Sequence, residues 1–412
     1  MIIVDGNEFG QLEYERQCFE WGKQLQSRKI RNRVVAVCMK QPLGILAAIH
    51  HLRQSEASLL LINGETPIQT ATETAKRSGC TYLVYEDIGT LIPIGGTTVI
   101  EEPSLLQYSS GTTGEPKQIA RPWRDIDVEI ASYNAAIQAE EWETPIIFVP
   151  VYHSFGLIAG TLSALARQTK PRIVTGRNPK AWLHEVHNTP NSILYAVPFL
   201  LHLMLSFPSK GLAFHRVVSS GSPLTEPLFR KLTERCDQLS QQYGCTEAGC
   251  IAFSQRPSKL EEVGELLDHF TAPTMPNKES VGEIGVFYKD KFIQTGDVGY
   301  MSDKRSIHLL GRLDDLINVA GLKVAPGEVE QVIVQLEGIQ EVVVYKTKHP
   351  VWGEAVKALV VCKGLTAEEI RAWCIAKLPP FKVPRVIEMV KAIPRLPSGK
   401  ISRKLLLERE MS

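Results

Sequence analysis

The chain has 412 residues, enough for one large domain and one smaller domain that each bury a core. Hydrophobic residues make up 44% of it and charged residues 22%, as in globular proteins. The formal net charge is +1, from 46 basic and 45 acidic side chains. This balance gives no electrostatic reason to expect a nucleic acid or a membrane surface as a partner.

The eight cysteines are scattered, and no two of them have the C-x-x-C spacing of a zinc or redox site. We therefore expect reduced thiols, as in cytoplasmic proteins. The N-terminal residues lack the basic and apolar regions of a signal peptide. No window reaches the roughly 18 apolar residues of a membrane span. The sequence predicts a soluble, cytoplasmic protein.

Short apolar runs alternate with amphipathic stretches through the first hundred residues, and the same pattern returns after residue 145. This alternation is typical of a parallel sheet with crossover helices, so we expect a large, multi-layer α/β domain. The expected strands are 34–39, 58–62, 82–85, 146–151, 172–176, 192–197 and 216–221, and the expected helices are 43–52, 70–78 and 158–166.

The pattern changes near residue 311, where antiparallel strands give way to a small α+β domain. Thr366, with Glu369 three residues later, forms a capping box that predicts the start of a helix. The other expected elements are strands 281–288, 295–311, 341–347 and 355–363 and helices 327–339 and 366–378. The predicted organisation is a large domain over 1–311, a hinge over 312–315 and a small, mobile C-terminal domain over 316–412.

The most distinctive motif is the segment 108–117, Tyr-Ser-Ser-Gly-Thr-Thr-Gly-Glu-Pro-Lys. Its glycines allow backbone N–H groups to approach phosphate oxygens, its hydroxyls add donors, and its lysine balances charge. It is not a Walker A loop, because G-x-x-x-x-G-K-[ST] is absent, and kinase signatures are absent too. The candidate phosphate-binding residues are Ser109, Ser110, Gly111, Thr112, Thr113, Gly114 and Lys117.

This loop resembles the phosphate loop of the adenylate-forming superfamily. The superfamily includes acyl- and aryl-CoA synthetases, aryl-acid adenylating enzymes of siderophore pathways, nonribosomal adenylation domains and luciferases. Four more motifs follow in the family's order: Gln242–Glu247 (Q-Y-G-C-T-E), Thr295–Tyr300 (T-G-D-V-G-Y), Gly311–Ile317 (G-R-L-D-D-L-I) and Leu396–Lys400 (L-P-S-G-K). The resemblance implies that ATP and Mg²⁺ activate a carboxylic acid to an acyl-adenylate. Its acyl group then passes to a thiol of CoA or of a carrier-protein phosphopantetheine.

The resemblance assigns nucleotide contacts to several of these residues. Tyr243 would stack its ring on adenine, Thr246 would hydrogen-bond the α-phosphate, and Glu247 would ligate Mg²⁺ through its carboxylate. Further contacts would come from Gln242 beside Tyr243 and from Gly221 and Ser222, in a loop that lines the adenine and acyl pockets.

Four more roles follow from the resemblance. Asp297 would accept hydrogen bonds from both ribose hydroxyls, and Arg312 would also reach the ribose. Lys400 would stabilise the charge that develops between the attacking carboxylate and the α-phosphate. Asp314 has the family's hinge position, about which the small domain rotates between the two half-reactions, and the segment 320–324 would then face the thiol tunnel.

The sequence also departs from the family. The chain is short, chiefly before the phosphate loop and between Glu247 and Thr295, which predicts an abbreviated N-terminal layer. Gln118 follows Lys117, where the family usually has glycine.

The residues around His153 limit which carboxylic acid the protein could use. His153 itself resembles the histidine at the mouth of the acyl pocket in the family's CoA ligases. Two interpretations of His153 stay open, because a histidine beside apolar residues is often a satisfied core group. The resemblance implies an aspartate near this position in members that activate amino acids and an asparagine in those specific for an ortho-hydroxyl, and the run 152–160 has neither. An aromatic acid or a fatty acid remains. Because the short chain resembles the family's compact aryl-acid ligases, a hydroxylated aromatic acid such as 3,4-dihydroxybenzoate is favoured. The pocket candidates are Tyr152, His153, Tyr195, Phe199, Ser219, Cys245 and Cys250.

Two alternatives remain from the sequence. A fatty-acid–CoA ligase would use the same adenylation motifs with a longer apolar tunnel. An inactive adenylate-binding scaffold would be expected to have lost Lys400, Glu247 or Asp297, and all three are present.

Overall fold

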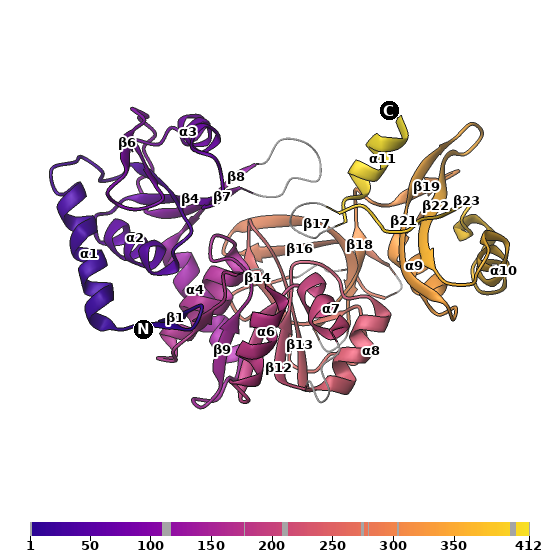
Figure 1. Ribbon diagram of the computed structural model, residues 1–412. Helices are drawn as coiled ribbons and strands as arrows, with labels where there is room; N and C mark the ends of the chain where they lie inside the picture. Colours follow the sequence, from indigo (N-terminus) through magenta and orange to yellow (C-terminus); the bar gives the residue numbers. More distant parts are fainter. Residues whose placement is uncertain are drawn as a thin grey trace. The chain divides into compact units, whose positions relative to one another are not determined.

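The computed structural model of the protein describes residues 2–108, 117–176, 178–207, 213–272, 276–278, 280–302, 305–395 and 401–411. Its contacts divide the chain into two compact units. Figure 1 labels the helices and strands of both. The first comprises Met1–Gly221, Arg235–Arg256 and Leu267–His269, and the second comprises Ser222–Glu234, Pro257–Leu266 and Phe270–Ser412. The domain boundary at residue 311 and the hinge at 312–315 stay predictions.

The first sheet of the first unit has the strand order β6-β5-β3-β4-β7-β8. Its central strands are parallel and its two edge strands antiparallel. Every residue of β3 is buried, as expected of a strand covered on both faces. The strands are β3 (Val34–Met39), β4 (Ser58–Asn63), β5 (Tyr82–Tyr85), β6 (Leu91–Pro93), β7 (Ser104–Tyr108) and β8 (Gln118–Pro122), and the helices are α1 (Gln11–Leu25), α2 (Pro42–Gln54) and α3 (Ile68–Arg77).

The second sheet of this unit has the order β14-β13-β12-β11-β9-β10-β1-β2, in which the strands from β13 to β1 are parallel. Strand β14 is antiparallel to β13, and the edge strand β2 is antiparallel to β1. The strands are β1 (Ile2–Val4), β2 (Asn7–Phe9), β9 (Thr144–Ile147), β10 (Arg172–Ile173), β11 (Ser192–Ala196), β12 (Phe214–Ser219), β13 (Cys236–Cys245) and β14 (Gly249–Ser254). The helices are α4 (Trp123–Ile137), α5 (Ser163–Ala166), α6 (Pro179–His187) and α7 (Pro198–Ser206).

The segment after β9 differs from its prediction. The strand expected over 146–151 ends at Ile147, ahead of Pro150, which has no backbone N–H to donate to a sheet. The helix expected over 158–166 begins earlier, as the π-helix η1 (Phe155–Leu162), and continues as α5. A Cβ at Gly156 would lie 2.4 Å from the Val149 carbonyl oxygen, so only glycine lets η1 begin this close to the preceding loop.

The second unit contains two antiparallel arrangements. Strands β16, β17, β18 and β15 are neighbours in that order, and a five-stranded sheet has the order β20-β19-β22-β21 with β23 parallel to β22. The predicted capping box is confirmed, since Glu369 N donates to Thr366 Oγ1 at 3.3 Å and Thr366 N donates to Glu369 Oε2 at 2.8 Å.

The strands of the second unit are β15 (Glu262–Leu266), β16 (Gly282–Tyr288), β17 (Lys291–Met301), β18 (Ser306–Arg312), β19 (Ile317–Val319), β20 (Leu322–Val324), β21 (Ile339–His349), β22 (Gly353–Cys362) and β23 (Val386–Met389). Its helices are α8 (Glu226–Arg235), α9 (Pro326–Val334), α10 (Ala367–Lys377), the 3₁₀ turn η2 (Pro380–Lys382) and α11 (Arg403–Met411).

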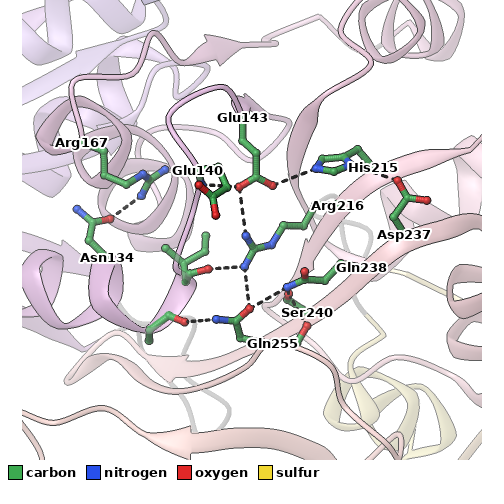
Figure 2. Close-up of polar contacts among 12 residues, drawn as sticks. Asn134, Glu140, Glu143, Arg167, His215, Arg216, Asp237, Gln238, Ser240 and Gln255 are labelled. Carbon is green, nitrogen blue, oxygen red and sulfur yellow. Dashed lines mark hydrogen bonds and ion pairs between the residues drawn. The ribbon is translucent and has the colours of Figure 1, made fainter.

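A polar network, buried at Glu143 and Arg216, joins the amino ends of β9, β12 and β13 (Figure 2). Arg216 donates to Glu143, with Nη1 and Oε2 3.4 Å apart, and to the Ile137 carbonyl. His215 lies between the carboxylates of Glu143 and Asp237, at 3.2 and 3.1 Å. The network lies at the opposite strand ends from the predicted site, so we assign it to the scaffold.

Two sequence-based expectations concern the whole chain. All eight cysteines are free thiols, as predicted. None of the helices in the described part of the chain has the length and apolar character that a membrane span needs.

Candidate active site

The predicted site residues of the first unit follow the carboxyl ends of neighbouring parallel strands. Such ends meet at one edge of a sheet, where ligands of α/β proteins usually bind. His153 follows β9, and Phe199 stands in the first turn of α7, after β11. Ser219 is the last residue of β12, and Gly221 and Ser222 are exposed just beyond it. The last residues of β13 include Gln242, Tyr243 and Cys245. The topology thus brings together residues that lie far apart in the sequence.

The loop that carries His153 is fixed to β7, the strand that leads into the phosphate-loop segment. Gln107 Nε2 donates to the Tyr152 carbonyl at 2.9 Å, and Ser154 Oγ donates to Gln107 Oε1 at 2.6 Å. The rings of Tyr152 and His153 are 4.3 Å apart. His153 is exposed, unlike a core histidine, which favours the functional interpretation of this side chain.

The Q-Y-G-C-T-E motif forms a β-hairpin. Strand β13 ends at Cys245, residues 246–248 make the turn, and β14 returns antiparallel. Tyr243 is buried, whereas Thr246 and Glu247 are partly exposed in the turn. These positions suit the predicted roles, with the Tyr243 ring stacked on adenine and Thr246 and Glu247 beside the phosphates. The roles of the three residues stay predictions.

Helix α4 anchors this hairpin through Glu129. Its Oε1 accepts a hydrogen bond from Cys250 N at 2.7 Å, and its other oxygen pairs with Arg121 of β8. Gly249 has φ +79°, and a Cβ there would lie 2.3 Å from Glu129 Oε2. The carboxylate therefore occupies the space that a larger residue would need, and Gly249 is required for this contact.

Burial controls the ionisation of the groups around this anchor. It raises the pKa of the Cys250 thiol well above its usual value, and the Glu129 carboxylate raises it further. Cys250 is therefore a neutral thiol and no nucleophile. Burial also lowers the pKa of His269 to about 4, and the Arg121 guanidinium contributes in the same direction.

Replacing Glu129 with Gln should destabilise the protein by about 3–5 kcal/mol, because Arg121 would remain buried without its counter-charge. The side chains of Arg121 and Glu129 are only 8% and 3% exposed. Urea unfolding measures the loss. Asp127→Asn on the same helix is the control: Asp127 pairs with Arg53 at 2.7 Å on the surface, where about 0–1 kcal/mol is expected. Equal, small losses in both variants would contradict a stabilising role for the buried pair.

The strand registers divide the pocket candidates between two faces of the sheet. Tyr195, Gln242 and Cys250 share one face, and Ser219 and Tyr243 lie on the other. The structure thus brings Tyr195 and Cys250 together and separates Ser219 from them. Of the remaining candidates, Phe199 is exposed and Cys245 is partly exposed.

Sequence reasoning missed the contribution of α4. Glu129 and Tyr133 stand on the buried face of this helix together with Ile126, Ile130 and Ile137. An acidic residue three positions after Ile126 and four before Tyr133 was the available signal, since a charge on an apolar face needs a partner in the interior.

In the second unit, Asp297 and Arg312 are register partners on β17 and β18. Arg312 Nη1 lies 2.9 Å from Asp297 Oδ1 and donates to the Thr295 carbonyl at 3.2 Å. Their side chains are 13% and 35% exposed. Residues of two motifs, 15 positions apart in the sequence, thus place a carboxylate and a guanidinium side by side. Such a pair can bind one polar ligand together.

Two other predicted positions have exposed surroundings. Asp314 is exposed in a turn, and its carbonyl oxygen lies 3.4 Å from Lys346 Nζ. Its neighbour Asp315 pairs with Arg403 at 2.9 Å. Residues 320 and 321 form the two-residue turn between β19 and β20, both with positive φ, as in a type I′ hairpin.

Some predicted residues lie outside the described part of the chain. They are Ser109, Ser110, Gly111, Thr112, Thr113, Gly114 and Lys400. Lys117 is the first residue described after the phosphate-loop segment, and it is exposed.

Within the described residues, no group of three or more His, Cys, Asp or Glu side chains could hold a metal ion. Glu247 would therefore bind Mg²⁺ together with phosphate oxygens, the mode in which this ion usually binds with one or two protein carboxylates. The partly exposed carboxylate in the hairpin turn fits that mode.

Comparison with known proteins decides the family. Residues 30–285 match the model of the AMP-binding enzyme family, and residues 328–400 match its AMP-binding enzyme C-terminal domain. The chain belongs to the AMP-binding enzyme family. The resemblance to adenylate-forming enzymes found in the motifs is thereby confirmed.

The chain is 44% identical over 407 residues to a 3,4-dihydroxybenzoate–[aryl-carrier protein] ligase of Bacillus anthracis, and the match covers 98% of both chains. The compact length is thus shared with this relative. Its name agrees with the compact aryl-acid ligase that the short chain resembles, the 3,4-dihydroxybenzoate-AMP ligase of petrobactin siderophore biosynthesis. A long-chain-fatty-acid–CoA ligase of Mycobacterium tuberculosis is 25% identical over 337 residues, covering 74% of this chain and 67% of the relative.

Solved structures confirm the predicted fold. ATP-bound MatB of Rhodopseudomonas palustris has a TM-score of 0.84 at 18% identity, with 99% of this chain and 95% of that chain covered. The O-succinylbenzoate–CoA synthetase MenE of Bacillus subtilis, in complex with ATP and magnesium, has a TM-score of 0.81 at 19% identity, with coverage of 98% and 96%. The chain therefore has the mixed α/β fold of these enzymes.

Proposed function

We propose that the protein activates 3,4-dihydroxybenzoate with ATP and transfers the acyl group to the phosphopantetheine thiol of an aryl-carrier protein. The observation that carries this proposal is the 44% identity, over nearly the whole of both chains, to a ligase of that name. The retained motifs Gln242–Glu247, Thr295–Tyr300 and Leu396–Lys400 support it.

The reaction has two half-reactions. In the first, a carboxylate oxygen of the acid attacks the α-phosphorus of ATP, the bond from this phosphorus to the bridging oxygen breaks, and pyrophosphate leaves. In the second, the thiolate of the carrier attacks the acyl carbonyl, the bond from this carbon to the AMP oxygen breaks, and a thioester and AMP result. Mg²⁺ would supply positive charge against the phosphate oxygens in the first half-reaction.

The residues of the described motifs suit binding of the nucleotide. Tyr243 would stack on adenine, Thr246 would donate to the α-phosphate, and Glu247 would hold the Mg²⁺ ion. The Asp297 carboxylate accepts hydrogen bonds and is therefore suited to a ribose diol, and its ion pair with Arg312 fixes its orientation.

The acid would enter beside His153, on the exposed loop fixed by Gln107. Tyr195 and Cys250 would line the interior of the pocket, where burial keeps the Cys250 thiol neutral. An uncharged lining of aromatic and small polar groups suits a flat ring with hydroxyls better than an alkyl chain. The similarity to the fatty-acid–CoA ligase is much lower and covers less of the chain, so that alternative is not favoured.

ATP–pyrophosphate exchange with a panel of acids tests the proposal. Hydroxylated benzoates should exceed octanoate and palmitate at least tenfold in kcat/KM, or about 1.4 kcal/mol of differential transition-state binding. Among benzoates, 3,4-dihydroxybenzoate should exceed the 2,3-isomer, because the run 152–160 offers no asparagine to an ortho-hydroxyl. A preference for fatty acids would instead make the protein an acyl-CoA synthetase.

The acceptor is tested separately. With 3,4-dihydroxybenzoate and ATP, a phosphopantetheinylated aryl-carrier protein should gain the mass of the acyl group faster than free CoA is acylated. Faster acylation of CoA would refute the carrier-protein assignment and leave the adenylation step intact.

A further inference from the structure

Two tyrosine hydroxyls are enclosed in the first unit. Tyr133 of α4 and Tyr195 of β11 are both 0% exposed. Among the described residues, neither phenolic oxygen has a hydrogen-bond partner. Leaving a buried hydroxyl unpaired costs free energy, so two of them in one interior require an explanation.

The two side chains face the same interior. The ring of Tyr133 packs edge-on against Phe253 of β14, with centroids 5.5 Å apart, and the ring of Tyr195 lies 5.9 Å from that of Phe155. Tyr195 and Phe253 share one sheet face by register. Burial raises the pKa of Tyr133, and the Tyr195 hydroxyl and the Cys250 thiol raise it further. The Tyr133 phenol is thus neutral and lies beside the Tyr195 hydroxyl and the Cys250 thiol.

A third unpaired atom lies on the same sheet face. Gln242 Oε1 is buried and has no hydrogen-bond partner among the described residues. Gln242, Tyr195 and Cys250 share this face, and Tyr133 approaches it from α4. Hydroxyl donors and an amide acceptor therefore lie on one sheet face and on the helix packed against it, beside the neutral Cys250 thiol.

This interior begins close to His153. Phe155 is two residues further along the chain, is partly exposed, and opens the π-helix η1. Its ring lies against Tyr195, so a flat aromatic ring that took its place would bring ring substituents toward the two phenols. π-Helical turns occur often at functional sites, where a helix has to adapt locally.

We propose that Tyr133 and Tyr195 are specificity residues that hydrogen-bond the ring hydroxyls of the aromatic acid, with Gln242 as a further acceptor. This inference rests on the proposed function and adds how the site selects a hydroxylated ring. A site that leaves polar groups unpaired when the ligand lacks a hydroxyl discriminates strongly against the unsubstituted analogue. Benzoate and alkyl acids would leave both phenols unpaired, whereas 3,4-dihydroxybenzoate satisfies them.

Tyr133→Phe and Tyr195→Phe test the inference, with kcat/KM in ATP–pyrophosphate exchange for 3,4-dihydroxybenzoate, 3-hydroxybenzoate, 4-hydroxybenzoate and benzoate. Each variant should reduce the ratio of 3,4-dihydroxybenzoate to benzoate at least tenfold, through loss of activity on the hydroxylated acid. Each variant should also lose the wild-type preference for one of the two monohydroxybenzoates over benzoate. The monohydroxybenzoate that is affected identifies the ring hydroxyl that the replaced tyrosine binds. The stability of both variants in urea should be unchanged or higher, because neither hydroxyl has a hydrogen-bond partner among the described residues.

The control is Tyr85→Phe, in the other sheet of the same unit. Tyr85 Oη donates to the Thr66 carbonyl at 3.0 Å, so this variant should lose stability and keep the wild-type substrate ratios. If both test variants keep the wild-type ratios while the wild type prefers 3,4-dihydroxybenzoate, the inference is wrong and the proposed function stands. A wild type that activates no hydroxybenzoate would overturn the proposed function, and the inference with it.

Discussion

Lys400→Ala should lower acid-dependent pyrophosphate release by about 10²–10³-fold, the range measured when one stabilising donor is removed from an enzyme's transition state. Lys400 ends the L-P-S-G-K motif and is proposed to place its ammonium between the attacking carboxylate and the α-phosphate. Removing it leaves the negative charge of the pentavalent transition state without that cation. Pyrophosphate release at saturating ATP and 3,4-dihydroxybenzoate measures the loss.

The second half-reaction separates this role from general damage. With synthetic acyl-adenylate supplied, the Lys400→Ala variant should form thioester at close to the wild-type rate, because in the family the lysine leaves the site before the thiol attacks. Lys391→Ala, which removes an exposed lysine nine residues earlier, should leave both half-reactions unchanged. Equal loss of both half-reactions in Lys400→Ala would show that the residue supports the fold rather than adenylation.

The strands of the α/β layers could be predicted because buried parallel strands are continuous apolar runs. Strand β3 has the predicted bounds Val34–Met39, and β5 has the predicted bounds Tyr82–Tyr85. The π-helix η1 could not be predicted in this way. Its residues from Gly156 to Thr161 are all buried, so the sequence shows no amphipathic period from which to recognise a helix type.

Candidate motif residues could be named from the sequence because phosphate and ribose recognition require particular residue types at fixed spacing, and their roles stay predictions. Contacts made through the fold could not. Glu129 looks like an ordinary helix carboxylate, and its hydrogen bond to Cys250 N spans 121 residues of sequence. Ser219 and Tyr195 lie on opposite faces of the sheet because of the register in which β11 and β12 pair. That register depends on both strands, so neither segment alone shows which residues share a face.

Asp297→Ala should raise the Kd for ATP about a hundredfold or more. The proposed carboxylate accepts two hydrogen bonds from the ribose, and each charge-assisted bond contributes about 1.5–3 kcal/mol. The fold should persist, because the side chain of Arg312 is 35% exposed and water can solvate the guanidinium once its partner is gone. Isothermal titration with ATP gives the affinity, and circular dichroism checks the fold.

The ribose assignment is tested most directly with 2′,3′-dideoxy-ATP, which lacks both hydroxyls that Asp297 would bind. The wild type should bind this analogue far more weakly than ATP, and Asp297→Ala should bind the two nucleotides with nearly equal affinity. Asp290→Ala removes an exposed carboxylate from the turn between β16 and β17, and it should keep the wild-type preference for ATP. If Asp297→Ala still prefers ATP as strongly as the wild type does, the ribose hydroxyls are bound elsewhere. The Asp297–Arg312 pair would then be a structural contact between β17 and β18.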